Sequence, residues 1–212
     1  MFVRTRMTAN PFTVTPESTV PQAQEIMQRH TVRHLPVVSG GKVVGVLSNS
    51  DVAGALPSRA TSLSAAELTY LVNRLKVSSV MSRHPITISP DALLEEAAVA
   101  MRDNKIEMLP VVEGDVLVGV ITESAILDAF IELLGFRDQG TRLTVDASDA
   151  PGVLAKLGQA AARHHANIQH VAVYRGADRS TVVIGVNTPN TAELEADLAA
   201  EGIVVLAKLV NP

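Results

Sequence analysis

Residues 35–48 read Leu-Pro-Val-Val-Ser-Gly-Gly-Lys-Val-Val-Gly-Val-Leu-Ser, and residues 109–122 read Leu-Pro-Val-Val-Glu-Gly-Asp-Val-Leu-Val-Gly-Val-Ile-Thr. In each stretch two β-rich runs flank turn residues, which is the pattern of a β-hairpin. Outward from these hairpins, residues 7–52 and 81–126 align without a gap at a constant offset of 74, and 15 of the 46 aligned positions are identical. This tandem copy predicts two similar units related by a pseudo-twofold axis, with a cleft where they face each other.

Each repeat predicts a strand, a helix, two strands and a second helix, because apolar residues recur at helical spacing between the extended runs. This β-α-β-β-α unit is small for an independent domain, so the two copies are expected to pack together. The elements are expected at residues 12–14, 19–30, 35–38, 43–47 and from Ser50 in the first repeat, and at 86–88, 91–104, 109–112, 116–121 and from Ser124 in the second.

The segment between the repeats predicts a connecting helix. Pro57 and Ser58 break the chain, and residues 64–67 (Ser-Ala-Ala-Glu) have the form of a capping box ahead of a helix that ends near Lys76. One apolar stripe of this helix is expected to pack on the repeats or on a second subunit, and it consists of Leu68, Leu71, Val72 and Leu75.

The pattern changes after Gly135, which is expected to stop the last helix of the second repeat. The order of the remaining elements, β-α-β-β-α-β, is ferredoxin-like. The whole chain is therefore expected to have an α+β fold. The last six elements are expected at residues 143–147, 153–163, 168–174, 181–186, 192–200 and 203–210.

Composition excludes several classes of protein. Of the 212 residues, 47% are hydrophobic and 19% charged, which favours a well-packed core over disorder. Aromatic residues make up only 3%, with no Trp, which argues against a stacking platform for nucleic acid. The chain has no Cys, hence no disulfide or thiolate site. Since neither a membrane span nor a secretory signal is evident, a cytoplasmic protein is expected.

Charge is distributed unevenly along the chain. Residues 1–60 carry six Lys or Arg against three Asp or Glu, whereas residues 77–137 carry four against ten. The first repeat is therefore basic and the second acidic. An anionic ligand in a shared cleft is expected to prefer the first-repeat side.

The repeat has Met-Thr-x-x-Pro-x-Thr from residue 7, Leu-Pro-Val-Val from residue 35 and Gly-Val-Leu-Ser-x-x-Asp from residue 45. With these motifs it resembles the CBS (cystathionine-β-synthase) domain, and the tandem resembles a CBS pair, or Bateman module. The last segment has Asp-Ala-Pro-Gly-Val-Leu from residue 149 and Ala-Asn-Ile from residue 166, and it resembles an ACT domain. The connector at residues 56–63 is similar to that of CBS–ACT proteins of the acetoin-utilisation type.

The resemblance implies a first CBS repeat at residues 1–60, a connecting helix at 61–76, a second CBS repeat at 77–136 and an ACT domain at 137–212. Both families are regulatory and bind ligands: CBS pairs typically bind adenine nucleotides, and ACT domains typically bind amino acids. An adenine nucleotide is thus the expected regulatory ligand, and no cofactor is expected to be required.

The most specific motif in the repeats ends the first hairpin. Ser48 is delivered to a helix N-terminus, where free N–H groups favour anions, and Asp51 can accept hydrogen bonds from a cis-diol. Ser-x-x-Asp is equally a capping box. The resemblance implies that Asp51 binds the ribose of a nucleotide. The second repeat has Thr122 but Ala125 in place of the carboxylate, so one good nucleotide site is expected rather than two.

Other cleft residues follow from the same resemblance. Arg33 and His34 occupy a position that often reaches phosphates in the CBS family, and a solvated strand edge is the alternative. Apolar groups of the second repeat expected around the adenine, or otherwise in the core, are Ile86, Ile106 and Met108, and Val46 is a further candidate for nucleotide binding.

In the ACT-like segment, the loop that enters the helix could hold a carboxylate through its backbone N–H groups. An ordinary helix start and turn is the alternative. The candidate residues are Asp149, Pro151, Gly152, Val153, Leu154 and Asn167, although His165 stands where many ACT domains have Gly.

No arrangement of nucleophile and base is evident, so an enzyme is not expected. His164, His165 and His170 lack a carboxylate at metal-ligand spacing, so no metal site is expected. The sequence thus predicts a non-catalytic sensor that is dimeric, binds an adenine nucleotide (AMP, ADP, ATP or S-adenosylmethionine) and signals through its ACT domains to an unknown protein. An amino-acid sensor, with the CBS pair as a dimerisation scaffold, is the alternative.

Overall fold

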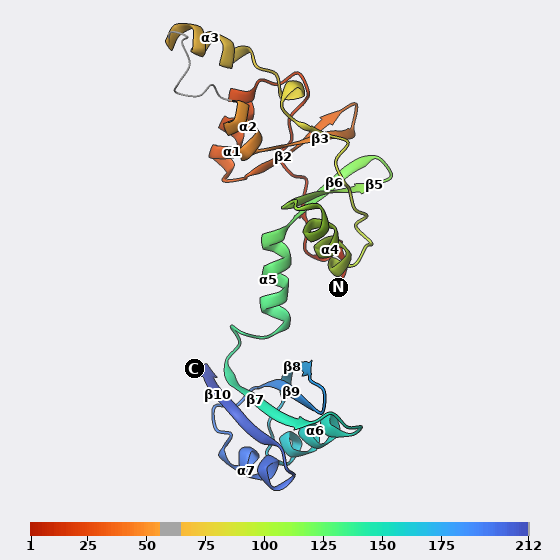
Figure 1. Ribbon diagram of the computed structural model, residues 1–212, viewed down its shortest axis with the longest axis vertical. Coiled ribbons are helices and arrows are strands. Elements are labelled where there is room, and N and C mark those ends of the chain that lie inside the picture. Colours follow the sequence, from red (N-terminus) through yellow and green to blue (C-terminus); the bar gives the residue numbers. More distant parts are fainter. Residues whose placement is uncertain (56–64, 212) are drawn as a thin grey trace. The chain divides into compact units, whose positions relative to one another are not determined.

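The computed structural model describes residues 1–55 and 65–211. The chain forms two compact units, Met1–Leu127 and Asp128–Pro212 (Figure 1). The first contains both repeats and the second contains the ferredoxin-like segment, as the sequence predicts.

Two hairpins form the centre of the first unit. One consists of β2 (His34–Ser39) and β3 (Lys42–Ser48), and the other of β5 (Met108–Glu113) and β6 (Val116–Thr122). They meet where Lys42 pairs with Val116. These two positions are related by the constant offset between the repeats, so they are equivalent. The pseudo-twofold axis therefore passes through this pair.

Each repeat also adds a short strand to the hairpin of the other repeat, a feature that no pattern in the sequence predicts. Strand β1 (Thr8–Ala9) pairs with β6, and β4 (Ser82–Arg83) pairs with β3. A 3-10 helix precedes each of them, Val3–Thr5 and Val77–Ser79. Because each repeat completes the sheet of its partner, neither is a separate folding unit.

Three helices pack on these hairpins, namely α1 (Val20–His30), α2 (Asn49–Ala55) and α4 (Leu94–Asn104). Helix α5 (Glu123–Leu133) follows β6 and crosses the boundary between the two units. In the first repeat, Val20, Ala23 and Met27 of α1 are buried against Leu35 and Leu47. Helix α4 begins at Leu94, later than the predicted residue 91. The reason is that Leu93 pairs with Phe2 and the N–H of Leu94 donates to the carbonyl of Met1, so this stretch is extended.

The connecting helix is α3 (Ala65–Arg74). Leu75 packs against the core of the first repeat, while Leu71 is exposed. The connector at residues 56–63, the predicted cap Ser64 and the side chain of Leu68 lie outside the described residues. The exact limits of the four predicted segments stay a prediction.

The second unit is a four-stranded antiparallel sheet in the order β10-β7-β9-β8. Leu157 of α6 and Leu194 of α7 are buried in one core with Leu143 and Ile184 of the sheet, so both helices cover the same face. The ferredoxin-like prediction is confirmed. The bounds are β7 (Gly140–Ser148), α6 (Val153–Arg163), β8 (Ile168–Arg175), β9 (Arg179–Val186), α7 (Ala192–Ala200) and β10 (Val204–Asn211).

Candidate functional site

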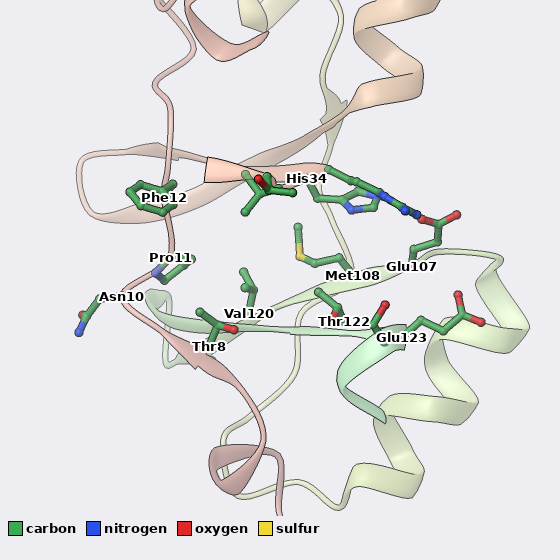
Figure 2. A pocket seen from close by; sticks show the side chains of 14 residues that line it. Thr8, Asn10, Pro11, Phe12, His34, Glu107, Met108, Val120, Thr122 and Glu123 are labelled. Carbon is green, nitrogen blue, oxygen red and sulfur yellow. The ribbon is translucent and has the colours of Figure 1, made fainter. Parts of the chain in front are cut away.

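A cavity of about 550 Å³ opens between the two repeats (Figure 2). Its walls come from the segment around β1, from the entry to β2, and from the junction of β6 with α5. It is therefore a site of the pair and not of either repeat alone. The lining residues are Thr8, Asn10, Pro11, Phe12, Thr31, Val32, Arg33, His34, Glu107, Met108, Val120, Thr122, Glu123 and Ser124.

Thr122 lies in this cavity where β6 passes into α5. Its Oγ1 accepts a hydrogen bond from the N–H of Ala125 (3.3 Å), and the N–H of Glu123 donates to the carbonyl of Glu107 (3.0 Å). The hydroxyl thus caps the helix. Ala125 supplies no carboxylate, as the sequence indicates.

The equivalent junction in the first repeat is a complete capping box. Oδ2 of Asp51 accepts from the N–H of Ser48 (2.8 Å) and from its hydroxyl (2.6 Å), and Ser48 Oγ accepts from the N–H of Asp51 (3.1 Å). The structural alternative raised from the sequence is therefore realised. Oδ1 takes no part in these bonds, so a second carboxylate oxygen remains for another donor.

His34 lies beside a carboxylate of the other repeat. It pairs with Ser48 in the β2–β3 register, and its Nε2 lies 3.9 Å from Oε2 of Glu107. Burial lowers the pKa of His34, against the opposing effects of Glu107 and Asp51, which favour the charged ring. The neutral imidazole is consequently favoured at neutral pH.

Three of the residues predicted from the sequence line the cavity directly: Arg33, His34 and Met108. Four others are related to lining residues by the repeat offset and are therefore their counterparts across the axis: Val46 (Val120), Ser48 (Thr122), Ile86 (Phe12) and Ile106 (Val32). Met108 is 5% exposed, whereas Ile86 is 42% exposed and so is not a core residue.

Sequence reasoning missed most of the lining around Thr122, including Phe12 of the first repeat and Glu123 of the second. It concentrated on the symmetry-related half of the cleft, which contains Asp51. The constant offset of 74 between the repeats could have identified these residues, because it assigns each predicted residue an equivalent residue in the other repeat.

A second cavity of about 370 Å³ lies in the second unit, at the loop between β7 and α6. Of the predicted residues, Asp149, Gly152, Val153 and Leu154 line it, while Pro151 and Asn167 do not. The N–H of Asn167 donates instead to the side chain of Asn187 (2.8 Å). Gly152 has φ +92° at the helix entry, a conformation that favours glycine.

Sequence reasoning did not identify Ser180 and Arg175, which also line this second cavity. Ser180 is only 3% exposed, and among the described residues its Oγ is the buried side-chain polar atom that lacks a hydrogen-bond partner. A buried hydroxyl without a partner is costly and therefore calls for a ligand or water. No pattern in the sequence marks one serine in a strand as unpaired.

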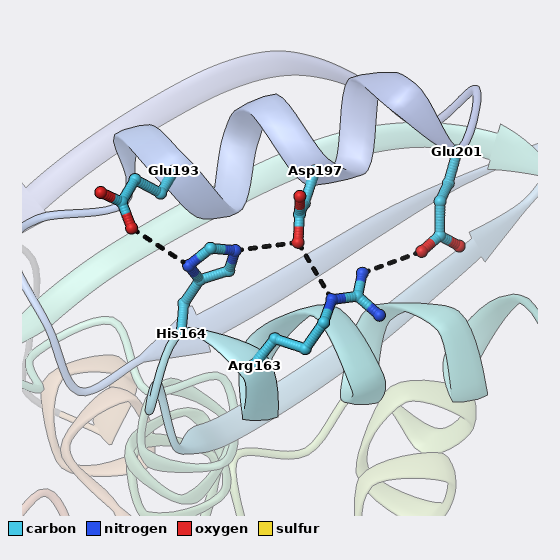
Figure 3. Close-up of polar contacts among 5 residues, drawn as sticks. All are labelled: Arg163, His164, Glu193, Asp197 and Glu201. Carbon is cyan, nitrogen blue, oxygen red and sulfur yellow. Dashed lines mark hydrogen bonds and ion pairs between the residues drawn. The ribbon is translucent and has the colours of Figure 1, made fainter.

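The histidine at the end of α6 belongs to a network of hydrogen bonds and ion pairs (Figure 3). His164 Nε2 lies 2.9 Å from Asp197 and Nδ1 lies 3.4 Å from Glu193, while Arg163 reaches Asp197 and Glu201 at 3.0 Å each. Hydrogen bonds from His164 and Arg163 lower the pKa of Asp197. The network ties α6 to α7. Within residues 1–55 and 65–211, no group of three or more His, Asp or Glu side chains is arranged so that it could hold a metal ion.

Comparison with known families agrees with this geometry. The family model of the CBS domain matches residues 3–58 and 77–132. The chain belongs to the CBS domain family. A second model, the TTHA0829-like ACT domain, matches residues 139–208 of this CBS protein. CBS and ACT domains are regulatory modules.

Curated relatives match the CBS part. The protein is 31% identical to CBS domain-containing protein YhcV of Bacillus subtilis (strain 168) over 142 residues, which is 67% of this chain and 92% of YhcV. It is 33% identical to inosine-5'-monophosphate dehydrogenase of Korarchaeum cryptofilum (strain OPF8) over 142 residues, 66% of this chain. The match spans only 26% of that dehydrogenase, so it concerns the CBS region and not the whole enzyme.

Solved structures resemble the same region. A putative acetoin utilization protein (AcuB) from Vibrio cholerae has a TM-score of 0.54 and 32% identity, covering 65% of this chain and 96% of its own. CBSX2 in complex with AMP has a TM-score of 0.53 and 29% identity (62% and 97% covered). The CBS domain pair of MJ0100 with 5'-methylthioadenosine and S-adenosyl-L-methionine has a TM-score of 0.51 and 26% identity (61% and 95%).

The described part of the chain contains no helix that is long and apolar enough to cross a membrane.

Proposed function

We propose that this CBS protein is a non-catalytic, cytoplasmic regulatory sensor that binds an adenine nucleotide between its two repeats. The observation that carries the proposal is the Oδ1 of Asp51, which the capping bonds at the start of α2 leave free. This position is equivalent, by the repeat offset, to the edge of the cavity of about 550 Å³ around Thr122, whose size is that of a small-molecule site. Related CBS pairs have been solved with AMP and with S-adenosylmethionine, which supports an adenosine-containing ligand here.

In this proposal the first-repeat half of the cleft receives the nucleotide. Asp51 accepts the ribose hydroxyls through Oδ1 while Oδ2 keeps its capping bonds, and Ser48 lies at the same helix start. Arg33 and His34 interact with the phosphates, because a guanidinium and an imidazole are suited to them. The adenine packs on the apolar residues Val46, Ile86, Ile106 and Met108.

The signal is proposed to pass to the ACT domain. Helix α5 is continuous from Glu123, which lines the cavity, to Leu133, which belongs to the second unit. A ligand that favours one conformation of the cleft can therefore bias the ACT domain through this helix. We propose that the protein acts as a homodimer and passes the change to a separate partner protein.

Thermal denaturation of the full chain with AMP, ADP, ATP and S-adenosylmethionine tests the proposal. At 100 times its dissociation constant, a ligand adds about 2.7 kcal/mol to the free energy of unfolding. The wild type is expected to be stabilised by at least one of these ligands, and Asp51→Ala much less. Absence of stabilisation by every adenosine compound would reject the cleft as a nucleotide site.

A second candidate function, amino-acid sensing by the ACT domain, is favoured by one observation. The unpartnered hydroxyl of Ser180 lies in a cavity with Arg175 and the entry to α6, so a carboxylate there could accept from all three. Asp149 supplies a negative charge for an α-ammonium group.

The test is a titration with amino acids of the wild type and of Ser180→Ala. If the site binds an amino acid, the substitution weakens binding while leaving the stability of the free protein unchanged or higher, because it removes an unsatisfied buried group. The same amino-acid affinity in Ser180→Ala and wild type would contradict this second function.

A further inference from the structure

The last turn of α5 ends in a compact motif made by its own backbone. Gly135 has a φ of +61°, a conformation that favours glycine. The N–H of Gly135 donates to the carbonyl of Glu132 (2.9 Å), and the N–H of Phe136 donates to that of Ile131 (3.4 Å). This is the pattern of a Schellman motif, which ends the helix and uses two of its last carbonyls. The two carbonyls that follow need other donors.

The sheet of the second unit supplies those donors from two strands. Nη1 of Arg142, in β7, donates to the carbonyl of Leu134 (2.8 Å). Nδ1 of His170, in β8, lies 3.1 Å from the carbonyl of Leu133, which can only accept, so this nitrogen is the donor. Such donors suit this place, because the C-terminus of a helix carries a partial negative charge. The sheet thus completes the capping of α5.

The imidazole of His170 is held in a narrow slot. Its Nε2 contacts Oδ2 of Asp138, in the loop that follows α5. A Cβ on Gly135 would lie 2.0 Å from Cδ2 of the ring, and a Cβ on Gly185, which pairs with His170 from β9, would lie 3.6 Å from the same atom. The glycine that ends α5 therefore also makes room for the ring that caps the helix.

A third strand holds the loop that follows the helix. Nδ2 of Asn211, at the end of β10, donates to the carbonyls of Phe136 (3.0 Å) and Asp138 (3.1 Å). Side chains of β7, β8 and β10 thus bind four backbone carbonyls between residues 133 and 138. All of these residues belong to the second unit. The end of α5 is therefore part of the same body as the sheet.

We infer that Arg142, His170 and Asn211 are positioning residues that join α5 to the ACT sheet as one rigid body, and that they relay a movement of this helix to the ACT domain. The Schellman motif alone would end the helix, whereas these side chains fasten it to three strands. Because α5 is continuous from Glu123, which lines the cavity, a ligand that shifts the start of the helix also moves its fastened end. The relay rests on the proposed function and deepens it by naming the residues that carry the signal.

Hydrogen exchange of the full chain without ligand tests the attachment. Arg142→Ala and His170→Ala are each expected to speed exchange of the amides of residues 134–136 about tenfold, because each removes a hydrogen bond that holds the helix end. His170→Asn keeps a side-chain N–H donor near the position of Nδ1 and should restore part of the protection.

The matched control is His164→Ala, which removes a histidine–carboxylate contact between α6 and α7 of the same unit and leaves the end of α5 intact. It should not change exchange at residues 134–136. If Arg142→Ala and His170→Ala do not change exchange there, or if His164→Ala changes it equally, the inference is overturned whether or not the chain binds a nucleotide.

Hydrogen exchange with saturating AMP tests the relay. In the wild type and in His164→Ala, AMP is expected to slow exchange at the start of α2 and also in β8 and β9 of the ACT domain. In the double variant Arg142→Ala/His170→Ala it should slow exchange at α2 alone, and His170→Ala carries the same test if the double variant does not fold. A response of β8 and β9 that these variants leave unchanged, or that the wild type lacks, overturns the relay. Absence of slowing at α2 in the wild type rejects the nucleotide site instead, and the attachment is then decided by the measurement without ligand.

Discussion

The two repeats have the same backbone and different chemistry at the start of their second helix. The first reads Ser48-Asn49-Ser50-Asp51 and the second Thr122-Glu123-Ser124-Ala125. In the first, the carboxylate is the third helical residue and closes a capping box. In the second, it is the first helical residue and lines the cavity. The position of the carboxylate thus decides whether it closes the helix cap, as in the first repeat, or lies at the wall of the cavity, as in the second.

The largest loss of stability is expected at Gly45 and Gly119, which occupy equivalent positions in the two repeats. A Cβ on Gly45 would lie 2.7 Å from Met81 Sδ and 2.9 Å from the carbonyl oxygen of Ser82, and one on Gly119 would lie 2.8 Å from Met7 Sδ and 3.0 Å from that of Thr8. Alanine at either position should cost about 1–3 kcal/mol by overpacking. Urea denaturation measures both losses.

Gly54→Ala is the control for these two variants. Gly54 lies in α2 and a Cβ there has no atom within 4 Å, so alanine should leave stability unchanged or raise it by about 0.5–1 kcal/mol. Equal losses at Gly45 and Gly119 would support the exchange of β1 and β4 between repeats. A loss at only one position would argue against it.

The second largest change in stability is expected at the capping box. Asp51→Ala should lower the free energy of unfolding by about 1 kcal/mol without any ligand, and Ala125→Asp should raise it by a similar amount, because each changes one helix cap. Chemical denaturation of the free protein measures this. If Ala125→Asp destabilises the chain, the two helix starts are not equivalent.

His34 occupies the position that Met108 has in the second repeat. Because only the histidine can take up a proton, the first repeat should give the stability of the protein a pH dependence at this position. The pKa of His34 is lowered by burial in the folded state, so between the folded and unfolded pKa values the unfolded chain binds the additional proton. Stability should therefore fall as pH drops below about 6.5, the ordinary value for His. His34→Met should reduce this loss, as melting temperatures at pH 8 and pH 5.5 would show. An identical pH dependence in the variant would contradict the assignment.

The smallest change in stability is expected at the ion pair beside the pseudo-twofold axis. Lys42 Nζ lies 2.6 Å from Asp115 Oδ2, and the hydrogen bond raises the pKa of Lys42 and lowers that of Asp115. Both groups are exposed, so water and salt screen the pair. Lys42→Ala should change the melting temperature less than any substitution above, and not at all in high salt. A large, salt-independent change would mean that the pair orders the two hairpins.

The repeat, the hairpins and both helices of the second unit could be predicted from the sequence, because they depend on local periodicity and on turn residues. Helix α6 begins at Val153 and ends at Arg163 as expected. Strands β1 and β4 could not be predicted in the same way. They are two residues long and are extended because of pairing with the other repeat, which no local pattern records.

The candidate site residues also fall into two groups: those that a local sequence pattern indicates, and those that only the folded chain brings together. Asp51 and Ser48 were evident because their spacing is a motif, and Gly152 was evident because of the loop that it enters. Two carboxylates, those of Glu107 and Glu123, line the cavity around Thr122. These residues precede and follow the β5–β6 hairpin, which brings them together. The lack of a hydrogen-bond partner for Ser180 Oγ depends on the positions of all the atoms around it, so no sequence pattern predicts it.

The central claim is that each chain has one site that accepts a phosphorylated adenosine, and that this site depends on Asp51. Calorimetric titration of AMP into the full chain and into Asp51→Ala tests it most directly. The account predicts one AMP per wild-type chain and at least tenfold weaker binding in the variant, the loss of a charge-assisted hydrogen bond. Two equivalent AMP sites, or the same affinity in Asp51→Ala, would contradict it.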